Sequence, residues 1–154
     1  MIGDAIILLG NVSFAAMEVT RRAVGRRSVP TISTEQLCDD QQQPRSCFQL
    51  VDVRSHAEQA VSMIPGAITA EQYESAPQRH QAQTIVPYCT IGGRSYLYAR
   101  RLVASGIDAK NYRDSVIGWC RHELPLVTPE GVPTRAVHPY WRVFTVPSSY
   151  TIKM

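Results

Sequence analysis

The stretch TIVPYCTIGGRS, residues 84–95, decides how the rest of the chain is interpreted. Its first five residues are rich in β-branched and aromatic side chains, which predicts a buried strand. The strand pattern ends at Cys89, and Gly92 and Gly93 follow it closely. The next residues lack glycine and proline and carry apolar side chains at helical spacing, which predicts a helix over 95–105. A cysteine is therefore expected between the end of a strand and the start of a helix.

This position has chemical consequences for Cys89. Helix N-termini present unpaired N–H groups and a partial positive charge, and a cysteine placed there has a lowered pKa. A shift of two units needs about 2.7 kcal/mol, whereas the helix dipole typically supplies about 0.3–1 kcal/mol. We expect the remainder from loop N–H groups and from the guanidinium of Arg94, with Gly92 and Gly93 letting the backbone curl around the sulfur. Cys89 is predicted to be an activated nucleophile.

Three ordered motifs resemble those of one protein family. Residues 89–95, CTIGGRS, resemble the C-x-x-G-x-R-S active-site loop of single-domain rhodanese-like sulfurtransferases. Residues 50–58, LVDVRSHAE, and 64–67, IPGA, resemble the D-V-R-x-x-x-E and G-H-I-P-G-A motifs of that family. Residues 111–119, NYRDSVIGW, are a weaker match. Together the matches span about residues 31–127. Two departures are Ser62-Met63 in place of Gly-His and Asp114-Ser115 in place of Gly-Gly.

The resemblance implies a sulfurtransferase that uses no metal and no cofactor beyond a covalent persulfide on Cys89. The thiolate would take the outer sulfur of a small anionic donor such as thiosulfate and pass it to a thiol or to cyanide, with a thioredoxin-like protein among the candidate acceptors. The substrate-binding loop would consist of Thr90, Ile91, Gly92, Gly93, Arg94 and Ser95. Within it, Arg94 would orient the donor, and Ser95 is expected to cap the following helix.

Three further charged residues are expected to support this site. Asp52, Arg54 and Glu58 belong to the second motif, and their role in the family looks largely structural. Arg54 and Glu58 lie four residues apart across a helix start and can pair. A direct contact of Asp52 or Arg54 with the substrate is the alternative.

Two other functions compete with sulfur transfer. A non-enzymatic rhodanese-like module that binds a partner protein is the first, although such a module has no need of both Cys89 and Arg94. A cysteine-dependent phosphatase or arsenate reductase is the second, but those enzymes use C-x5-R. Here four residues separate Cys89 from Arg94, and Tyr88 rather than histidine precedes the cysteine. The shorter loop suits one sulfur atom better than three phosphoryl oxygens.

The order of elements predicts the fold class. Short strands are expected near residues 30–32, 47–53, 84–88 and 108–112, with helices after Ser33, over 55–61 and over 95–105. Alternating strands and helices favour a parallel sheet covered on both faces. We therefore expect an α/β, rhodanese-like fold with a parallel sheet of about five strands in a three-layer α/β/α arrangement. Ligand sites in such folds lie at the carboxyl ends of strands, where Cys89 falls.

The chain divides into a central domain, residues 30–127, and two extensions. Residues 1–29 are interpreted as a helical or targeting-like extension, whose apolar run Ala5–Leu9 is expected to be too short to span a bilayer. Four arginines follow that run, so organelle targeting is an alternative to the expected cytoplasmic location. Residues 128–154 are rich in aromatics, which are expected to pack on the domain's own surface or to contact a partner.

Charge and cysteine content limit the remaining function classes. A net charge of +3 in 154 residues is mild, so neither nucleic acid nor a membrane is an expected partner, and oligomeric state is open. The four cysteines show no C-x-x-C pair and no zinc-like spacing. Cys38, Cys47 and Cys120 are interpreted as packing residues, with a redox role of Cys120 as the alternative.

Overall fold

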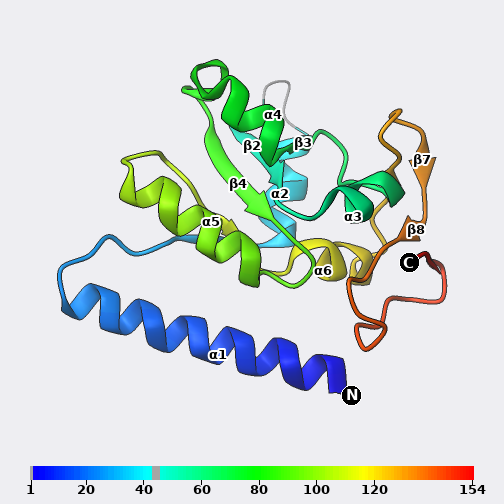
Figure 1. The fold of residues 1–154 in the computed structure, drawn as a ribbon, viewed down its shortest axis with the longest axis horizontal. Helices are drawn as coiled ribbons and strands as arrows, with labels where there is room; N and C mark the ends of the chain where they lie inside the picture. The colour runs from blue at the N-terminus through cyan, green and yellow to red at the C-terminus, as the bar shows by residue number, and fades with distance from the viewer. Residues whose placement is uncertain (1, 43–45) are drawn as a thin grey trace.

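The computed structural model describes residues 2–42 and 46–154. Five short strands form its central parallel sheet: β1 (Thr31–Ile32), β2 (Phe48–Asp52), β3 (Ile68–Thr69), β4 (Thr84–Tyr88) and β5 (Asn111–Tyr112). Strands β3, β2 and β4 pair in that order, and β1 pairs with β5. A parallel bridge between Ile85 and Ala109 joins the two groups. The spatial order is thus β1–β5–β4–β2–β3, which confirms the expected parallel sheet of about five strands (Figure 1).

Helices cover both faces of this sheet. In chain order the helices of the described residues are α1 (Ile2–Ala23), α2 (Thr34–Gln41), α3 (His56–Val61), α4 (Ala70–Ser75), the 3₁₀ helix η1 (Pro77–His80), α5 (Gly93–Ala104) and α6 (Ser115–Arg121). Four two-residue strands follow: β6 (Leu126–Val127), β7 (Pro133–Thr134), β8 (Ala136–Val137) and β9 (Thr151–Ile152). Helices α2 and α6 pack on one face of the sheet and α4 and α5 on the other. The α/β class and the three layers are confirmed.

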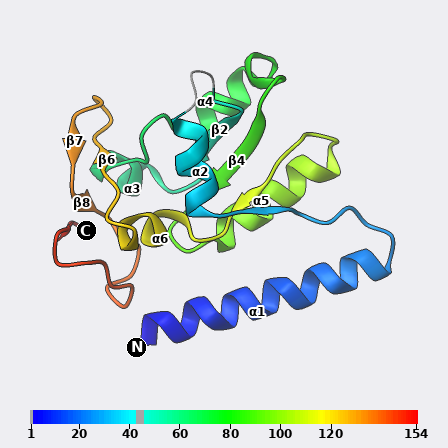
Figure 2. The same ribbon diagram turned by 180° about the vertical axis from the view of Figure 1, so that it is seen from behind.

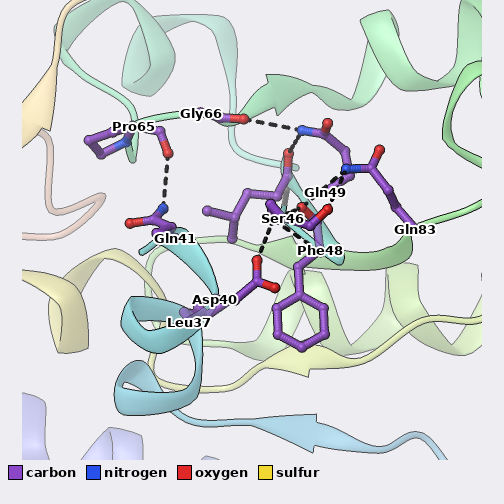
Figure 3. A pocket seen from close by; sticks show the side chains of 10 residues that line it. Leu37, Asp40, Gln41, Ser46, Phe48, Gln49, Pro65, Gly66 and Gln83 are labelled. Atoms are coloured by element: carbon purple, nitrogen blue, oxygen red, sulfur yellow. Dashed lines mark hydrogen bonds between the residues drawn. The ribbon is translucent and has the colours of Figure 1, made fainter. Parts of the chain in front are cut away.

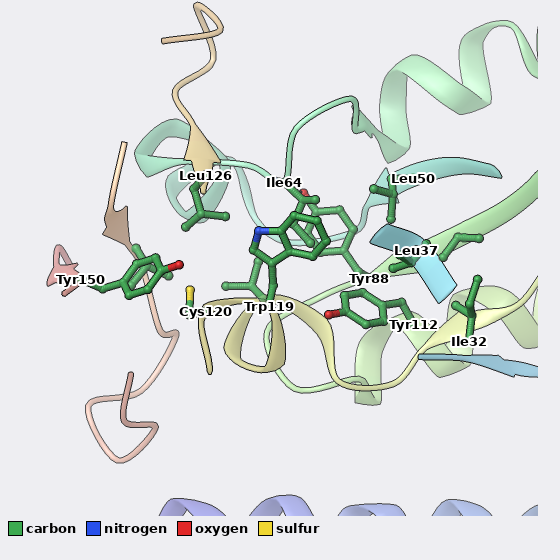
Figure 4. Close-up of a cluster of buried hydrophobic side chains, with 13 residues drawn as sticks. Ile32, Leu37, Leu50, Ile64, Tyr88, Tyr112, Trp119, Cys120, Leu126 and Tyr150 are labelled. Carbon is green, nitrogen blue, oxygen red and sulfur yellow. The ribbon is translucent and has the colours of Figure 1, made fainter. Parts of the chain in front are cut away.

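Alternate residues of the central strands point to opposite faces, as the pleat of a strand requires. Leu50 and Val86 belong to the core beneath α2 and α6, and Figure 4 shows this core gathered around Trp119. Val51 and Ile85, their neighbours in sequence, belong to the core beneath α4 and α5. Strands that are buried on both faces have continuous runs of apolar residues in their sequence, and for this reason the sequence predicts β4.

Three helices begin with capping boxes, which explains where they start. The side chains of Ser33, Ser55 and Thr69 each accept a hydrogen bond from the backbone N–H three residues later, and the side chain of that later residue accepts one from the backbone N–H of the cap. This reciprocal bonding satisfies two N–H groups that a helix start leaves unpaired. In α3 the side chain that accepts from the cap N–H is that of Glu58, so the cap also fixes a carboxylate of the candidate site.

Some local expectations differ from the structure. Helix α5 begins at Gly93, with Gly92 as its N-cap, so Ser95 is the third helical residue and not the cap. The sequence does not predict helices α4 and α6, because α4 is short and largely polar and α6 is short and contains Gly118. The expected strand over 108–112 is reduced to Asn111–Tyr112 and the single bridge at Ala109.

Helix α1 is much longer than its apolar run suggested. It spans 22 residues and, judged by length and composition, could cross a membrane, because the helix continues through Asn11 and Ser13. The expectation that this segment is too short to span a bilayer is therefore corrected. Figures 1 and 2 show α1 alone along one side of the domain, outside the three layers.

The C-terminal extension packs on the domain. Val137, Phe144 and Tyr150 are buried, whereas Tyr140 and Trp141 are exposed. Strand β8 pairs in parallel with β9. The hydroxyl of Tyr150 donates to the carbonyl of Leu124, just after α6. Packing of part of these aromatics on the domain's own surface agrees with the expectation from sequence.

Candidate active site

Cys89 directly follows β4, at the carboxyl end of the sheet. Its main chain is held on both sides by the start of α6: its N–H donates to Ser115 Oγ at 3.1 Å, and its carbonyl accepts from Val116 N–H at 3.1 Å. Its Sγ accepts a hydrogen bond from the backbone N–H of Gly92 at 3.1 Å. The side chain is 1% exposed. The sulfur is thus fixed beside a backbone N–H donor at the foot of α5.

Gly92 is required by the geometry of the loop. Its φ is +90°, a conformation that L side chains rarely adopt, and a Cβ there would lie 2.2 Å from the carbonyl oxygen of Arg113. Gly93 is different, because it is the first helical residue and a Cβ there would only reach the Phe14 ring at 3.6 Å. Of the two glycines expected to let the loop curl, only Gly92 is required by its positive φ and by its close approach to the Arg113 carbonyl.

Arg94 is held by Glu58 in a bidentate pair. Nη1 and Nη2 of Arg94 lie 2.8 and 2.7 Å from the two carboxylate oxygens. Thr90 Oγ1 donates to the same carboxylate at 2.7 Å and accepts from Arg94 Nη2 at 2.9 Å. Burial raises the pKa of Glu58, but the hydrogen bonds from Arg94, Ser55 and Thr90 outweigh burial and lower it to about 2. Glu58 is therefore an anion at neutral pH that fixes the arginine of the loop.

The pairing expected between Arg54 and Glu58 is wrong. Arg54 instead pairs with Asp52, its Nη2 lying 2.7 Å from Oδ2, and it also donates to the carbonyl of Ser62. The hydroxyl of Tyr88 donates to the same Asp52 oxygen at 2.6 Å. Burial and the Asp52 charge raise the pKa of Tyr88 well above its usual value. All these groups are buried, and they tie β2 to β4 and to the segment after α3.

The remaining loop residues lie at different depths. Ile91 is half-buried, and Thr90 is buried with its hydroxyl engaged by Glu58 and Arg94. Ser95 is buried, and its Oγ has no hydrogen-bond partner among the described residues. Partial burial lowers the pKa of Arg94, but the pairing with Glu58 and the proximity of Cys89 raise it overall. The loop thus brings Cys89, Glu58 and Arg94 into one electrostatic cluster.

Three contacts to this cluster were not anticipated from sequence. Ser115, in the place where the family often has glycine, has φ +52°, and its hydroxyl joins Cys89 N–H to the carbonyl of Tyr112. Tyr140 of the C-terminal extension lies over the Arg94 guanidinium, with 4.7 Å between the Tyr140 ring centroid and the guanidinium carbon. Phe14 of α1 lies near Gly93. Of the three, only Ser115 could be noticed in the sequence, because it departs from the glycine of the family motif. The contacts of Tyr140 and Phe14 join segments that are distant in the sequence.

The other cysteines lie apart from this cluster. Cys120 is buried in the core beneath α6, and burial raises the pKa of its thiol to about 12. Burial also raises the pKa of Cys38, whereas Cys47 is exposed. Among the described residues, no group of three or more His, Cys, Asp or Glu could hold a metal ion.

A pocket of about 400 Å³ lies at the opposite end of the sheet, near the amino ends of β2 and β4 (Figure 3). Its polar side chains satisfy one another or nearby backbone: Gln41 donates to Pro65, and Gln49 donates to Gly66, each at 3.2 Å. Among the described residues that line it, the hydroxyl of Ser46 is the one candidate nucleophile, and it donates to Asp40. The reactive chemistry therefore lies with Cys89.

Comparison with known proteins agrees with this geometry. Residues 33–122 match the family model described as rhodanese-like domain. A sulfurtransferase from Allochromatium vinosum is 37% identical over 86 residues, covering 53% of this chain and 80% of the relative. A rhodanese-like domain protein from Staphylococcus aureus has a similar solved structure, with TM-score 0.51, 26% identity, and coverage of 59% and 91% of the two chains.

A thiosulfate sulfurtransferase from Pseudomonas aeruginosa has the same fold, with TM-score 0.59 and 21% identity. The match covers 78% of this chain and 23% of that longer one. The family model covers more than half of the present chain and includes β2, β4, the Cys89 loop and α6. The chain belongs to the rhodanese-like domain family.

Proposed function

We propose that this chain moves a sulfane sulfur from a thiosulfate-like donor to a thiophilic acceptor through a persulfide on Cys89. The observation that carries the proposal is the 3.1 Å hydrogen bond from Gly92 N–H to Cys89 Sγ at the foot of α5. A backbone donor and a helix N-terminus both favour negative charge on that sulfur. The family match and the sulfurtransferase relative support sulfurtransferase-type function.

The proposed reaction is a double displacement. The Cys89 thiolate attacks the outer sulfur of thiosulfate, a sulfur–sulfur bond forms, and the bond to the sulfonate sulfur breaks with its electron pair leaving as sulfite. An acceptor thiolate or cyanide then attacks the outer sulfur of the persulfide. The sulfur–sulfur bond breaks and its electrons return to Cys89 as the thiolate. No electron source beyond donor and acceptor is required.

Arg94 is proposed to orient the anionic donor. Its side chain remains 37% exposed although Glu58 holds one edge of the guanidinium. Because Glu58 is fully buried and Arg94 is not, the positive charge is presented toward solvent. Asp52 and Arg54 bond each other beneath the loop, which supports a structural role for both.

Burial of Cys89 favours the second candidate, a non-enzymatic module that binds a partner protein. The cysteine is 1% exposed, and Tyr140 stacks on Arg94. A donor would have to reach the sulfur beside this tyrosine. Phosphatase or arsenate reductase activity is the weaker candidate, since the loop between Cys89 and Arg94 is one residue shorter than those reactions use.

Mass spectrometry of the intact protein after thiosulfate treatment tests the proposal. We expect a gain of one sulfur atom that maps to Cys89, is lost on addition of cyanide and is absent from Cys89→Ser. Cys47→Ser is the matched control, because Cys47 is the exposed cysteine outside the site, and it should gain sulfur like the wild type.

Steady-state turnover of thiosulfate and cyanide separates the candidates. Turnover by wild type and Cys47→Ser, with none in Cys89→Ser, supports the enzyme. Equal background in all three proteins supports the binding module. Cys89-dependent hydrolysis of an aryl phosphate without sulfur transfer would replace the proposal with the phosphatase.

A further inference from the structure

Helix α1 exposes an apolar side to solvent, opposite the side that contacts the domain. At about 100° per residue, one arc of roughly 120° on the helix carries Thr20 near its edge and, over residues 2–19, a set of exposed apolar side chains. These are Ile2, Ala5, Leu8, Leu9, Val12, Ala16 and Val19. Soluble proteins bury such a stripe against their core, and in α1 the only buried residue is Gly3.

The hydroxyls near this stripe are satisfied within the helix. Ser13 Oγ donates to the carbonyl of Leu9 at 2.8 Å, and Thr20 Oγ1 donates to that of Ala16 at 3.1 Å. Neither O–H group therefore needs a water molecule as its hydrogen-bond acceptor. A helix face with this property can enter an apolar medium at low cost, because unsatisfied polar groups are what make such transfer expensive.

The opposite side of α1 is held on the domain by polar and aromatic contacts. Glu18 accepts hydrogen bonds from the Val29 N–H at 2.9 Å and from the Tyr96 hydroxyl at 2.5 Å. The rings of Phe14 and Tyr96 pack together at a tilt of 35°, with centroids 4.6 Å apart. Asp4 pairs with Arg121 near the other end of the helix. These contacts keep α1 lying along the domain, as Figures 1 and 2 show.

We propose that α1 binds the surface of an anionic lipid bilayer, lying in its plane with the outward apolar stripe inserted. Helices of this kind bury their apolar face a short way into the bilayer and carry basic residues for anionic headgroups. Exposed Arg22, Arg26 and Arg27 follow the stripe at its C-terminal end and supply that charge. In-plane binding keeps the Glu18 and Asp4 contacts, which a spanning helix would break.

Charge and length favour lipid over a second copy of the chain. The stripe extends over about five turns, roughly 27 Å, and ends in a cluster of arginines that suits anionic headgroups and would repel across a parallel helix pair. Exposed Trp141 lies in the segment that packs against the N-terminal end of α1, since Gly3 lies against the carbonyl of Val143. Tryptophan is the residue that membrane interfaces favour.

Sedimentation of the purified full chain with phosphatidylcholine vesicles, with and without phosphatidylglycerol, tests the proposal. We expect binding that is stronger to the anionic vesicles. Val12→Asp should lower the partition coefficient about tenfold or more, because it places a charge in the inserted stripe. Val132→Asp is the matched control: Val12 and Val132 are 60% and 57% exposed, and Val132 is remote from α1 in sequence, so binding should be unchanged.

Two further measurements decide the mode of binding. Arg22→Gln with Arg26→Gln should remove the preference for anionic vesicles but keep the thiosulfate reaction of the wild type. A protease-accessible N-terminal tag on bound protein supports the in-plane helix, and a protected tag overturns it. Equal sedimentation of Val12→Asp and Val132→Asp overturns the proposal. A second outcome also overturns it: light scattering shows that the wild type is a dimer without lipid, Val12→Asp is a monomer, and neither protein binds vesicles.

Discussion

At the scale of single residues, the pair of Glu58 and Arg94 organises the loop. The carboxylate is fully buried and collects hydrogen bonds from Arg94, Thr90 and Ser55. It therefore belongs to the helix cap and to the active-site loop at once. A residue with two such roles is sensitive to substitution, because its removal leaves several donors unpaired.

Glu58→Gln should destabilise the protein by about 2 kcal/mol at pH 7. This loss of stability is smaller than the loss expected when one partner of a fully buried ion pair is removed, because Arg94 is partly exposed. The pKa of Glu58 is lowered from 4.5 to about 2, so its stabilisation is complete above pH 4.5 and is lost as the pH falls toward 2. Urea unfolding at pH 7, 4 and 3 should therefore show a smaller loss of stability on acidification in Glu58→Gln than in the wild type.

The matched control is Glu71→Gln. Glu71 is exposed, and its contact with His56 is 3.9 Å, so its replacement should leave both stability and pH dependence near the wild type. Identical acid sensitivity of wild type and Glu58→Gln would contradict the assignment of a buried ionised carboxylate.

At the scale of elements, the turn from β4 into α5 depends on one conformation. Gly92 is the N-cap, with φ +90°, and its carbonyl accepts a hydrogen bond from Asn111 Nδ2 at 3.3 Å. The carbonyl of Arg113 lies directly against the Gly92 backbone. The loop, the start of α5 and the segment after β5 are therefore packed as one unit.

Gly92→Ala should cost about 2 kcal/mol or more of stability and abolish the proposed sulfur transfer. The added Cβ would meet the Arg113 carbonyl at 2.2 Å and strain the left-handed backbone, moving the N–H away from Cys89. Gly93→Ala is the control, because it adds a methyl at ordinary contact distance in the first helical position. Thermal unfolding and thiosulfate turnover should separate the two variants, and equal behaviour would show that the loop tolerates a different path.

At the scale of the whole molecule, the C-terminal extension completes the domain. Phe144 is 1% exposed, and Tyr150 and Val137 join the core around Trp119 and Cys120. The family match ends at residue 122, so these contacts lie beyond it. The extension also brings Tyr140 to Arg94, which links it to the site.

Phe144→Ala should destabilise the protein by about 3 kcal/mol, since it leaves a cavity where a large aromatic was buried. Trp141→Ala is the control at a neighbouring aromatic that is 53% exposed, and its effect should be below about 1 kcal/mol. Urea unfolding measures both. Equal small losses would mean that the extension is detached from the domain in solution.

The local sequence determined the strand over Thr84–Tyr88, the cysteine after it and the parallel α/β class. Hydrophobic runs, β-branched residues and glycines influence the backbone conformation of residues only a few positions away, so their effect can be predicted from the local sequence. It could not determine that Arg54 pairs with Asp52 and Glu58 with Arg94, or that Ser115 and Tyr140 reach the Cys89 loop. Those contacts join residues up to 46 positions apart, as between Arg94 and Tyr140. Only the packing of the sheet, its helices and the extension brings them within bonding distance. The same holds for α1: its composition was visible, but which of its faces points to solvent was decided by the tertiary structure.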